Sequence, residues 1–300
     1  GCAVQEFAGK VAVVMGGGGV LGAAMARRFA REGMAVAIAD ADVDALAATQ
    51  EELLERGATV LAVETDISSG ESVEALAARV TEELGGVHVL CNNVGINTRD
   101  VSIWTTTERD WHWAIGANLW GMIHALRVFV PIMLEGGEEG HIVNTASTAG
   151  LAGRPGTGSY VVTKSAVLAL SEVLWHELKQ EQAAVSVSVL IPHIRGAVTR
   201  TRRPDEFTNP GQEDQAELDL ERYHTRLAVS ESRTDYPTAD EIAGHVVDSI
   251  REDRFYIISR PDIGHAIAKA RAEAIVDGKT PATAGMEYHQ RHETDAPSQT

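Results

Sequence analysis

Close to the start of the chain stands the stretch Met15-Gly16-Gly17-Gly18-Gly19-Val20-Leu21-Gly22-Ala23. An apolar run of strand character precedes it, Lys10–Met15, and an Ala-rich segment of helical period follows it, Leu21–Arg31. Three of its glycines meet the spacing G-x-G-x-x-G: Gly17, Gly19 and Gly22. In such a loop, backbone N–H groups approach a pyrophosphate at the N-terminus of a helix. A flexible turn would also account for the glycines, so the surrounding elements decide the matter.

These surroundings alternate between short β-branched runs and longer Ala-rich stretches of helical period. We expect strands at Lys10–Met15, Ala35–Ala39, Thr59–Val63, His88–Cys91, His141–Thr145, Val185–Ile191 and Phe255–Ser259. We expect helices at Leu21–Arg31, Val43–Arg56, Ser72–Leu84, Asp110–Leu134, Ser159–Gln182, Ala239–Glu252 and about 262–276. The alternation predicts an α/β fold of Rossmann type, a doubly wound parallel sheet of about seven strands in a three-layer α/β/α arrangement.

The composition changes after Arg195. Residues 195–237 are highly charged and hold three prolines, and we interpret them as an inserted loop that covers the substrate as a mobile lid. A short amphipathic helix is expected within it, on Leu220, Tyr223 and Leu227. Residues 279–300 are polar and lack a core pattern, which is typical of a flexible C-terminal tail. We therefore expect residues 1–278 to form a single domain.

Composition and charge argue against several classes of protein. The chain has 300 residues, 44% of them hydrophobic, so it can bury a sizeable core. Its formal net charge of −17 repels phosphate backbones, so we expect no nucleic-acid partner. Apolar runs are too short for a membrane span and no leader pattern is recognisable, so we expect no membrane partner. The two cysteines, Cys2 and Cys91, indicate no disulfide framework, and a cytoplasmic location is expected.

An acidic residue, Asp40, ends the second expected strand. It follows the glycine loop at a distance typical of the acid that binds the adenosine ribose hydroxyls. A carboxylate there repels a 2′-phosphate, and the loop carries no Arg or Lys. We therefore expect NAD rather than NADP as the cofactor. The alternative is a solvated aspartate at the end of a strand.

The sharpest candidate for catalysis is the set Ser147, Tyr160 and Lys164. Tyr160 and Lys164 lie one turn apart, so they share a face of an expected helix. An ammonium beside a phenol lowers the pKa of the phenol, so Tyr160 can exchange a proton with an alcohol or a ketone. Ser147, at the end of the fifth expected strand, is placed to hydrogen-bond the reacting oxygen. The alternative is an exposed helical pair, because this spacing is common by chance.

With these elements the sequence resembles the classical short-chain dehydrogenase/reductase family over about residues 6–260. The residues that carry the resemblance are Gly16–Gly22, Asp40, Asp66, Asn92-Asn93-Val94-Gly95, Asn118, Ser147 and Tyr160-x-x-x-Lys164. The resemblance implies that Tyr160 is the acid/base and that Lys164 also holds the nicotinamide ribose. It further implies that Ser147 orients the substrate oxygen and that Asn118 supports a proton-relay water. The expected catalytic residues are Ser147, Tyr160, Lys164 and Asn118.

The resemblance also implies a set of cofactor contacts. Asp66 matches the residue that meets adenine, and Asn93 and Gly95 match a motif beside the cofactor. The expected cofactor-binding residues are Gly16, Gly19, Val20, Leu21, Gly22, Asp40, Asp66, Ile67, Asn93, Gly95, Tyr160 and Lys164.

Three departures from the family pattern stand near the expected site. Met15 replaces a threonine and Val20 a glycine of the usual loop. Val94 enlarges the usual Asn-Asn-Ala-Gly motif. The third departure, Pro192-His193-Ile194-Arg195, stands where the family has Pro-Gly. These positions bear on the path of the loop, on cofactor affinity and on contacts to the nicotinamide amide.

Other residues have both a functional and an ordinary interpretation. Trp104 is a candidate for the substrate cleft, whereas the tryptophans of the following helix are expected to pack. His176-Glu177 begins a zinc-protease spelling, but Gln180 replaces the second histidine, so no metal site is expected. An arginine cluster in the inserted loop is either solvated or a clamp for an anionic substrate group: Arg195, Arg200, Arg202 and Arg203.

The sequence thus predicts an NAD-dependent oxidoreductase that interconverts a secondary alcohol and a ketone by hydride transfer, with Tyr160 as general acid/base. Two alternatives are a dinucleotide-binding regulator without turnover, and a lyase or epimerase on the same scaffold. The extended loop and the last strand resemble those of dehydrogenases of bulky aromatic alcohols. We also expect a homo-oligomer, a tetramer or a dimer, paired through the outer faces of Asp110–Leu134 and Ser159–Gln182.

Overall fold

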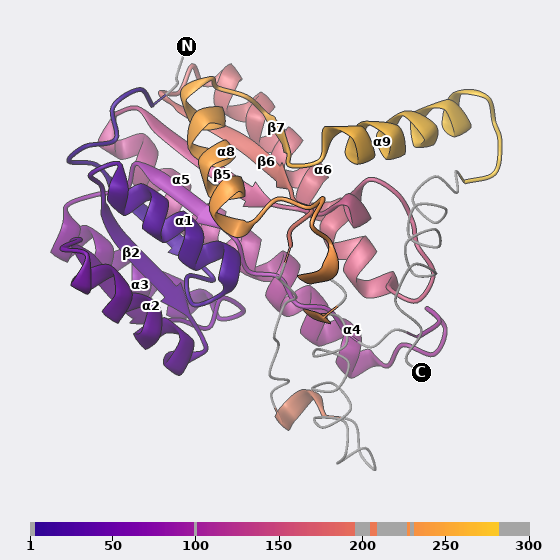
Figure 1. Cartoon of the computed structure of the whole chain (residues 1–300), viewed down its shortest axis with the longest axis horizontal. Helices are drawn as coiled ribbons and strands as arrows, with labels where there is room; N and C mark the ends of the chain where they lie inside the picture. Colours follow the sequence, from indigo (N-terminus) through magenta and orange to yellow (C-terminus); the bar gives the residue numbers. More distant parts are fainter. Residues whose placement is uncertain (1–3, 99–100, 196–204, 209–226, 229–230, 282–300) are drawn as a thin grey trace.

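The computed structural model describes residues 4–98, 101–195, 205–208, 227–228 and 231–281. A parallel sheet lies at its centre (Figure 1), built from β1 (Val11–Met15), β2 (Ala35–Asp40), β3 (Val60–Glu64), β4 (Val89–Asn92), β5 (Gly140–Thr145), β6 (Val185–Ile191) and β7 (Tyr256–Ile258). The order across this 7-stranded sheet is β3-β2-β1-β4-β5-β6-β7. The chain therefore winds outward in both directions from β1, which confirms the predicted doubly wound α/β fold.

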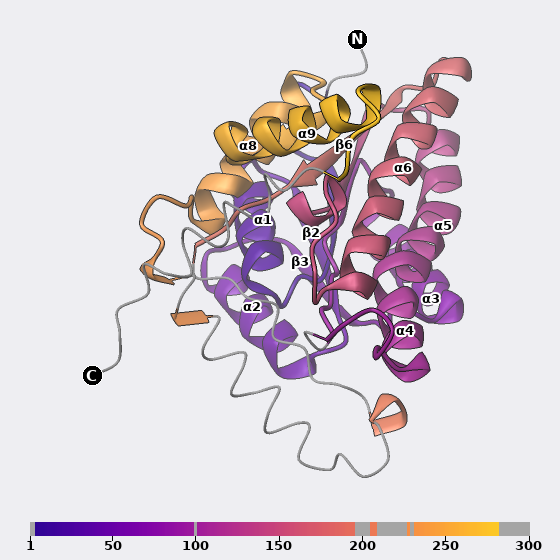
Figure 2. The ribbon, with the colours of Figure 1, turned by 90° about the vertical axis from the view of Figure 1, so that its right-hand side faces the viewer.

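Helices cover both faces of the sheet (Figure 2). One layer contains α1 (Val20–Arg31), α2 (Val43–Glu55) and α8 (Ala239–Arg251). The other contains α3 (Gly70–Leu84), α5 (Gly121–Gly136) and α6 (Gly158–Gln180). A last helix, α9 (Pro261–Val276), follows β7 and extends beyond the edge of the sheet (Figure 1).

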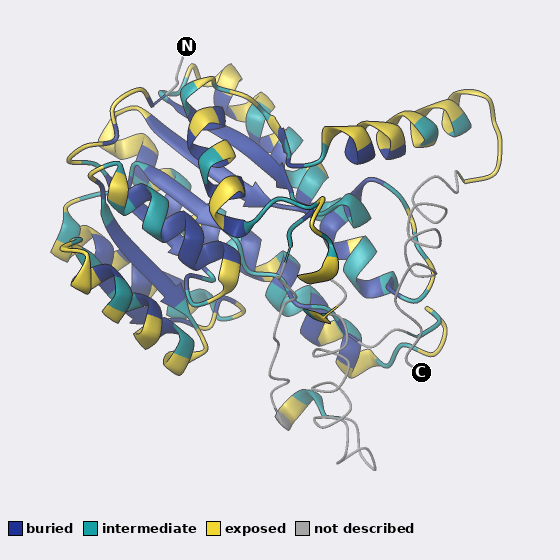
Figure 3. Ribbon diagram, viewed as in Figure 1, coloured by how far each residue is buried: buried dark blue, intermediate teal, exposed yellow. Residues whose placement is uncertain are grey.

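Alternating residues of each strand feed the two apolar layers between the sheet and its helices. Val14 and Ile38 pack with Phe29 in the layer of α1. Their strand neighbour Val13 packs with Phe129 in the layer of α5. Strands of a parallel sheet are buried on both faces, and so β1 is apolar at every position. Figure 3 shows this arrangement as a dark blue sheet between helices that are exposed on their outer sides.

The helix predicted at Asp110–Leu134 contains a wider turn that the sequence analysis did not foresee. It consists of α4 (Glu108–Ile115), a π-helical turn η1 (Gly116–Trp120) and α5, which follow one another directly. Such turns insert a residue into the helical repeat and are frequent at functional sites. The buried residue of this turn is Asn118, one of the expected catalytic residues.

The run from Glu108 to Gly136 is also the one described helix whose length and composition would suffice to cross a membrane. Its buried side chains Ala125, Phe129 and Met133 pack on the sheet as those of a core helix do. At the start of α5 a Cβ on Gly121 would stand 2.6 Å from Cγ1 of Ile67. The helix therefore approaches the loop after β3 more closely than any side chain at this position would allow.

Several predictions concern residues that the structure does not describe. Arg200, Arg202, Arg203, Leu220, Tyr223 and residues 282–300 lie outside the described ranges. The limits of the inserted loop at 195–237 and of the tail at 279–300 stay predictions. Among the described residues, no three His, Cys, Asp or Glu side chains gather as they would around a metal ion.

Candidate active site at the carboxyl edge of the sheet

The glycine loop is folded tightly over the end of β2. The amides of Gly16 and Gly17 donate to the carbonyl of Ala39 at 2.7 and 3.0 Å. A Cβ on Gly22 would stand 1.9 Å from the carbonyl oxygen of Gly16, a clash that no backbone adjustment of tenths of an ångström relieves. Gly16 also has φ +75°, a left-handed conformation that favours glycine. The loop path thus depends on the glycines at its two ends.

The middle of the loop delivers the start of α1 to the same edge. Gly19 is the N-cap residue of α1, and Val20, the first helical residue, is half-exposed. Leu21 is buried in the core between α1 and the sheet. The exposed N-terminal turn carries the positive end of the helix dipole, which is where a pyrophosphate binds.

Asp40 is tied to this loop. One of its carboxylate oxygens accepts from the amide of Gly18 at 3.0 Å, and the other accepts from the amide of Asp42 at 3.0 Å. Burial raises the pKa of Asp40, against the effect of these backbone hydrogen bonds. Asp40, the residue predicted to bind the adenosine ribose, therefore lies against the glycine loop, and its negative charge is close to any ligand bound there.

The loop after β3 carries the next two predicted contacts. Asp66 is exposed and accepts from the amide and the hydroxyl of Ser68 at 2.9 and 2.7 Å. Ile67 is buried against Gly121 at the start of α5. This loop is held to α5 by apolar packing while the Asp66 side chain stays at the surface.

Asn93 and Gly95 follow β4 and meet the catalytic elements. The side-chain oxygen of Asn93 accepts from the hydroxyl of Thr145, the last residue of β5, at 3.2 Å. A Cβ on Gly95 would stand 3.0 Å from Nζ of Lys164. The predicted cofactor residues and the predicted catalytic residues are therefore in contact at this point.

Lys164 and Tyr160 lie one turn apart on α6, as predicted. Nζ of Lys164 donates to the carbonyl of Thr145 at 2.8 Å and lies 5.8 Å from the centroid of the Tyr160 ring. The side chain is buried, and its desolvation lowers the pKa of Lys164 to about 8. Ser147, which follows β5, is the N-cap of the short 3₁₀ turn η2 (Thr148–Gly150). The structure thus brings the three predicted catalytic side chains to one place.

The pKa of Tyr160 differs from the sequence-based expectation. Burial raises it, and this effect exceeds the lowering by the hydrogen bond with Ser147 and by the charge of Arg154. Arg154 was not among the predicted site residues. It stands in the turn between Ser147 and Tyr160, so its position in the sequence was the available signal.

Asn118 joins the loop after β4 to α6 through side-chain hydrogen bonds. Its amide nitrogen donates to the carbonyl of Ile96 at 2.9 Å and to the hydroxyl of Thr163 at 3.0 Å. Its oxygen accepts from the amide of Ile96 at 2.7 Å. Thr163 in turn donates to the carbonyl of Tyr160 at 3.0 Å. The Asn118 side chain is therefore committed to the protein, and its support of a relay water stays a prediction.

The family model of the short chain dehydrogenases matches residues 10–206, which span the glycine loop, Ser147, Tyr160 and Lys164. The chain belongs to the short-chain dehydrogenase/reductase family. The predicted resemblance is confirmed, and it places this protein among the oxidoreductases.

Relatives of this short-chain dehydrogenase/reductase support the assignment over most of its length. A short chain dehydrogenase/reductase from Burkholderia phymatum, solved with NAD, is 38% identical with a TM-score of 0.85 and covers 93% of this chain and 98% of its own. The 1-deoxy-11-beta-hydroxypentalenate dehydrogenase of Streptomyces exfoliatus is 33% identical over 84% of each chain. A metagenomic short-chain oxidoreductase, solved with NADP, is 30% identical with a TM-score of 0.59 and covers 68% of this chain and 89% of its own.

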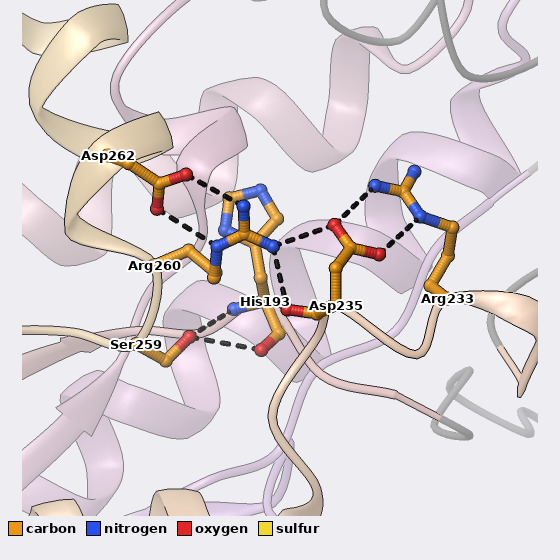
Figure 4. A network of polar contacts seen from close by, with 6 residues as sticks. All are labelled: His193, Arg233, Asp235, Ser259, Arg260 and Asp262. Atoms are coloured by element: carbon orange, nitrogen blue, oxygen red, sulfur yellow. Dashed lines mark hydrogen bonds and ion pairs between the residues drawn. The ribbon is translucent and has the colours of Figure 1, made fainter.

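The short-chain dehydrogenase/reductase departs from the family's Pro-Gly at His193, and Figure 4 shows what holds this residue. Its amide donates to the hydroxyl of Ser259 at 2.7 Å, and that hydroxyl donates to the carbonyl of His193 at 3.0 Å. The ring lies edge-on against Tyr236, with centroids 5.3 Å apart. The segment after β6 is thereby fixed to the end of β7.

Charged side chains hold the segment that leads into α8 (Figure 4). Asp235 accepts from Arg233 at 3.0 and 2.9 Å and from Arg260 at 2.8 Å. Arg260 also forms a two-pronged ion pair with Asp262 at 2.9 and 2.7 Å. The pKa of Asp235 is held well below its usual range, mainly by the hydrogen bonds from Arg233. Part of the charge that the sequence places between 195 and 237 therefore anchors the segment before α8.

The buried ammonium of Lys164 generates a prediction about pH. In the unfolded chain a lysine keeps its proton up to about pH 10.4, whereas in the native protein the pKa of Lys164 is about 8. Between these values the unfolded state binds more protons, so stability rises with pH. We expect the free energy of unfolding of the wild type, relative to Lys164→Met, to increase by up to about 3 kcal/mol between pH 7 and pH 10.5.

Denaturant unfolding of both proteins at a series of pH values measures this difference. Groups distant from residue 164 titrate equally in the two proteins and cancel, and a second pair of proteins that both carry Tyr160→Phe removes the contribution of the neighbouring phenol. A difference that stays flat, or that falls with rising pH, would show that the ammonium of Lys164 is not destabilised by burial.

Proposed function

We propose that the protein is an NAD-dependent oxidoreductase that interconverts a secondary alcohol and a ketone, with Tyr160 as general acid/base. One observation carries the proposal. Tyr160 hydrogen-bonds Ser147 and lies on α6 one turn from Lys164, which itself contacts the loop after β4. Three groups thus meet beside the glycine loop: Tyr160 to transfer a proton, Ser147 to hydrogen-bond the substrate, and the buried cation of Lys164.

The residues at the carboxyl edge fit a nicotinamide dinucleotide. The glycine loop brings bare backbone to the N-terminus of α1, as a pyrophosphate requires. The residues that would hold the cofactor are Gly16, Gly19, Val20, Leu21, Gly22, Asp40, Asp66, Ile67, Asn93, Gly95, Tyr160 and Lys164. When bound, the cofactor supplies hydride transfer to or from the substrate carbon.

Asp40 favours NAD over NADP in this proposal. A carboxylate offers about four acceptor positions, and the backbone amides around Asp40 occupy only part of them. Those that remain suit ribose hydroxyls, whereas the 2′-phosphate of NADP would meet a negative charge at short range. Solved structures similar to this chain hold either cofactor, so the preference rests on Asp40.

The proton step depends on the state of Tyr160. Burial raises the pKa of Tyr160, so the neutral phenol dominates near pH 7 and is ready to return a proton to a ketone. Alcohol oxidation needs the phenolate, so its rate should increase as the pH rises. The charge of Arg154 and the Ser147 hydrogen bond both stabilise that phenolate. Ser147 then orients the substrate oxygen toward Tyr160.

The rim of the site favours a bulky apolar substrate. Ile103 packs so closely on the start of α6 that a Cβ on Gly158 would stand 3.0 Å from its Cγ1. Ile103 is 54% exposed and its neighbour Trp104 is 83% exposed. Two large apolar side chains therefore stand at the surface, and one of them, Ile103, packs on Gly158 just before Tyr160 in α6. By its name, the similar dehydrogenase of Streptomyces exfoliatus acts on 1-deoxy-11-beta-hydroxypentalenate.

We also propose a homo-oligomer, a dimer or a tetramer, that pairs through α5, the preceding turn η1 and α6. Large apolar side chains are half-exposed on these elements: Trp120, Leu134, Val162 and Val173. Light scattering at micromolar concentration should give two or four times the monomer mass of 32.1 kDa. A monomer under these conditions contradicts the pairing.

Asp40→Asn tests the cofactor preference. The amide keeps the size of the side chain and an acceptor for the Gly18 amide, but it removes the charge. We expect NAD to bind about 10-fold to 100-fold more weakly, the usual value of a hydrogen bond to a charged group, and NADP to gain. Calorimetric titration of both cofactors into both proteins measures the change. Equal binding of NAD and NADP by the wild type would contradict the assignment.

Tyr160→Phe tests the proton transfer. The variant keeps the ring and its packing but removes the hydroxyl, so turnover should fall by about 10²–10⁴-fold. NAD affinity and melting temperature should change little. Tyr256→Phe is the matched control, because its hydroxyl bonds Glu172 on the surface of α6 and should not affect turnover. Near-normal turnover of Tyr160→Phe with a proven substrate would refute the mechanism.

A further inference from the structure

The turn that holds Ser147 has its own framework of hydrogen bonds. The Ser147 hydroxyl accepts from the amide of Ala149 at 3.2 Å, and its carbonyl accepts from the amide of Gly150 at 2.8 Å. The amide of Leu151 donates to the carbonyl of Thr148 at 3.0 Å. The position of the Ser147 hydroxyl therefore depends on where the turn of residues 147–151 lies.

Two side chains from outside the turn bind its last carbonyls. Nη1 of Arg271, on α9, donates to the carbonyl of Leu151 at 3.0 Å and to that of Gly150 at 3.3 Å. The Gly150 carbonyl also accepts from the hydroxyl of Ser165 on α6 at 3.2 Å. Gly150 itself sits on α6, since a Cβ there would stand 2.7 Å from the carbonyl oxygen of Lys164. The turn is thus held from α6 on one side and from α9 on the other.

Apolar packing places α9 for this contact. Leu151 belongs to the same buried cluster as Ile263 and Ile267 of α9. At Gly264 a Cβ would stand 2.6 Å from Cγ2 of Ile258 in β7, so the helix also lies close against the sheet edge. Arg271 follows Ile267 by one helical turn. Its hydrogen bonds to the turn therefore lie next to the apolar contact of Ile267 with Leu151.

We propose that Arg271 is a positioning residue for catalysis, which acts by fixing the turn that presents Ser147 to Tyr160 and the substrate. The inference rests on the proposed function. Without the guanidinium, the carbonyls of Gly150 and Leu151 lose their donor from α9, and only apolar packing still joins the turn to that helix. Small displacements of a reacting group cost large factors in rate, so the effect should fall on turnover. Arg271 lies outside the residues that the family model matches, whereas the turn that it contacts lies inside them.

Arg271→Met keeps the apolar stem of the side chain and removes its donors. We expect kcat to fall by about tenfold or more, as for a slightly misplaced reacting group, while the KM for NAD stays unchanged. Lys269→Met is the matched control, because Lys269 is a solvent-exposed cation on the same helix. Both variants should keep the wild-type melting temperature within a few degrees.

A double-mutant cycle with Ser147→Ala separates positioning from general stability. If Arg271 acts through Ser147, then Arg271→Met causes little further loss of kcat once the Ser147 hydroxyl is absent. The same fold-loss in both backgrounds would overturn the inference, as would an unchanged kcat in the wild-type background.

Hydrogen exchange gives a readout that needs no substrate. The amides of Gly150 and Leu151 should exchange faster in Arg271→Met than in Lys269→Met. If the wild type is active but these amides exchange equally fast in both variants, the positioning role of Arg271 is wrong and the proposed function stands. A wild type that turns over no alcohol or ketone overturns the proposed function, and the positioning role with it, even if exchange has changed.

Discussion

The site depends on the hydrogen bond from the ammonium of Lys164 to the carbonyl of Thr145, which requires that a positive charge be buried. The side chain is 2% exposed, and burial of a cation is unfavourable, which is why the pKa of Lys164 is lowered. This contact fixes α6 to the end of β5. It also draws in the loop after β4, since Gly95 leaves just enough room for the ammonium. The end of β5, the helix α6 and the loop after β4 therefore all meet at one buried charge.

Neutral hydrogen bonds around that charge keep the surrounding backbone in place. Asn118 joins the loop after β4 to α6 through Ile96 and Thr163, and Thr163 continues to the backbone of Tyr160. Asn118 reaches both partners from within the π turn η1, the wider turn of the long helix. Tyr160 is thus positioned through its backbone, and its hydroxyl forms a hydrogen bond with Ser147.

Local patterns predicted most of this fold, and contacts between distant segments account for what they missed. The strands and the helices followed from apolar runs and helical period, and the glycine loop with Asp40 followed from spacing. The turn η1 was missed because its residues keep the apolar character of the helix around them. The pKa of Tyr160 was misjudged because the sequence shows the neighbouring lysine but not the degree of burial. Arg271 bonds a carbonyl 121 positions away, and no periodicity marks such a pair.

The two ends of the predicted inserted loop are fixed by contacts among the described residues. The amide of Arg195 donates to the carbonyl of Pro237 at 2.9 Å, so the two ends of the loop meet. His193 with Ser259 secures one end, and the ion pairs of Asp235 secure the other (Figure 4). Once its ends are closed, a loop costs only about 0.6 kcal/mol more for each doubling of its length. We therefore expect the length of the segment between Arg195 and Pro237 to have little effect on stability, because the contacts that fix its ends do not depend on it.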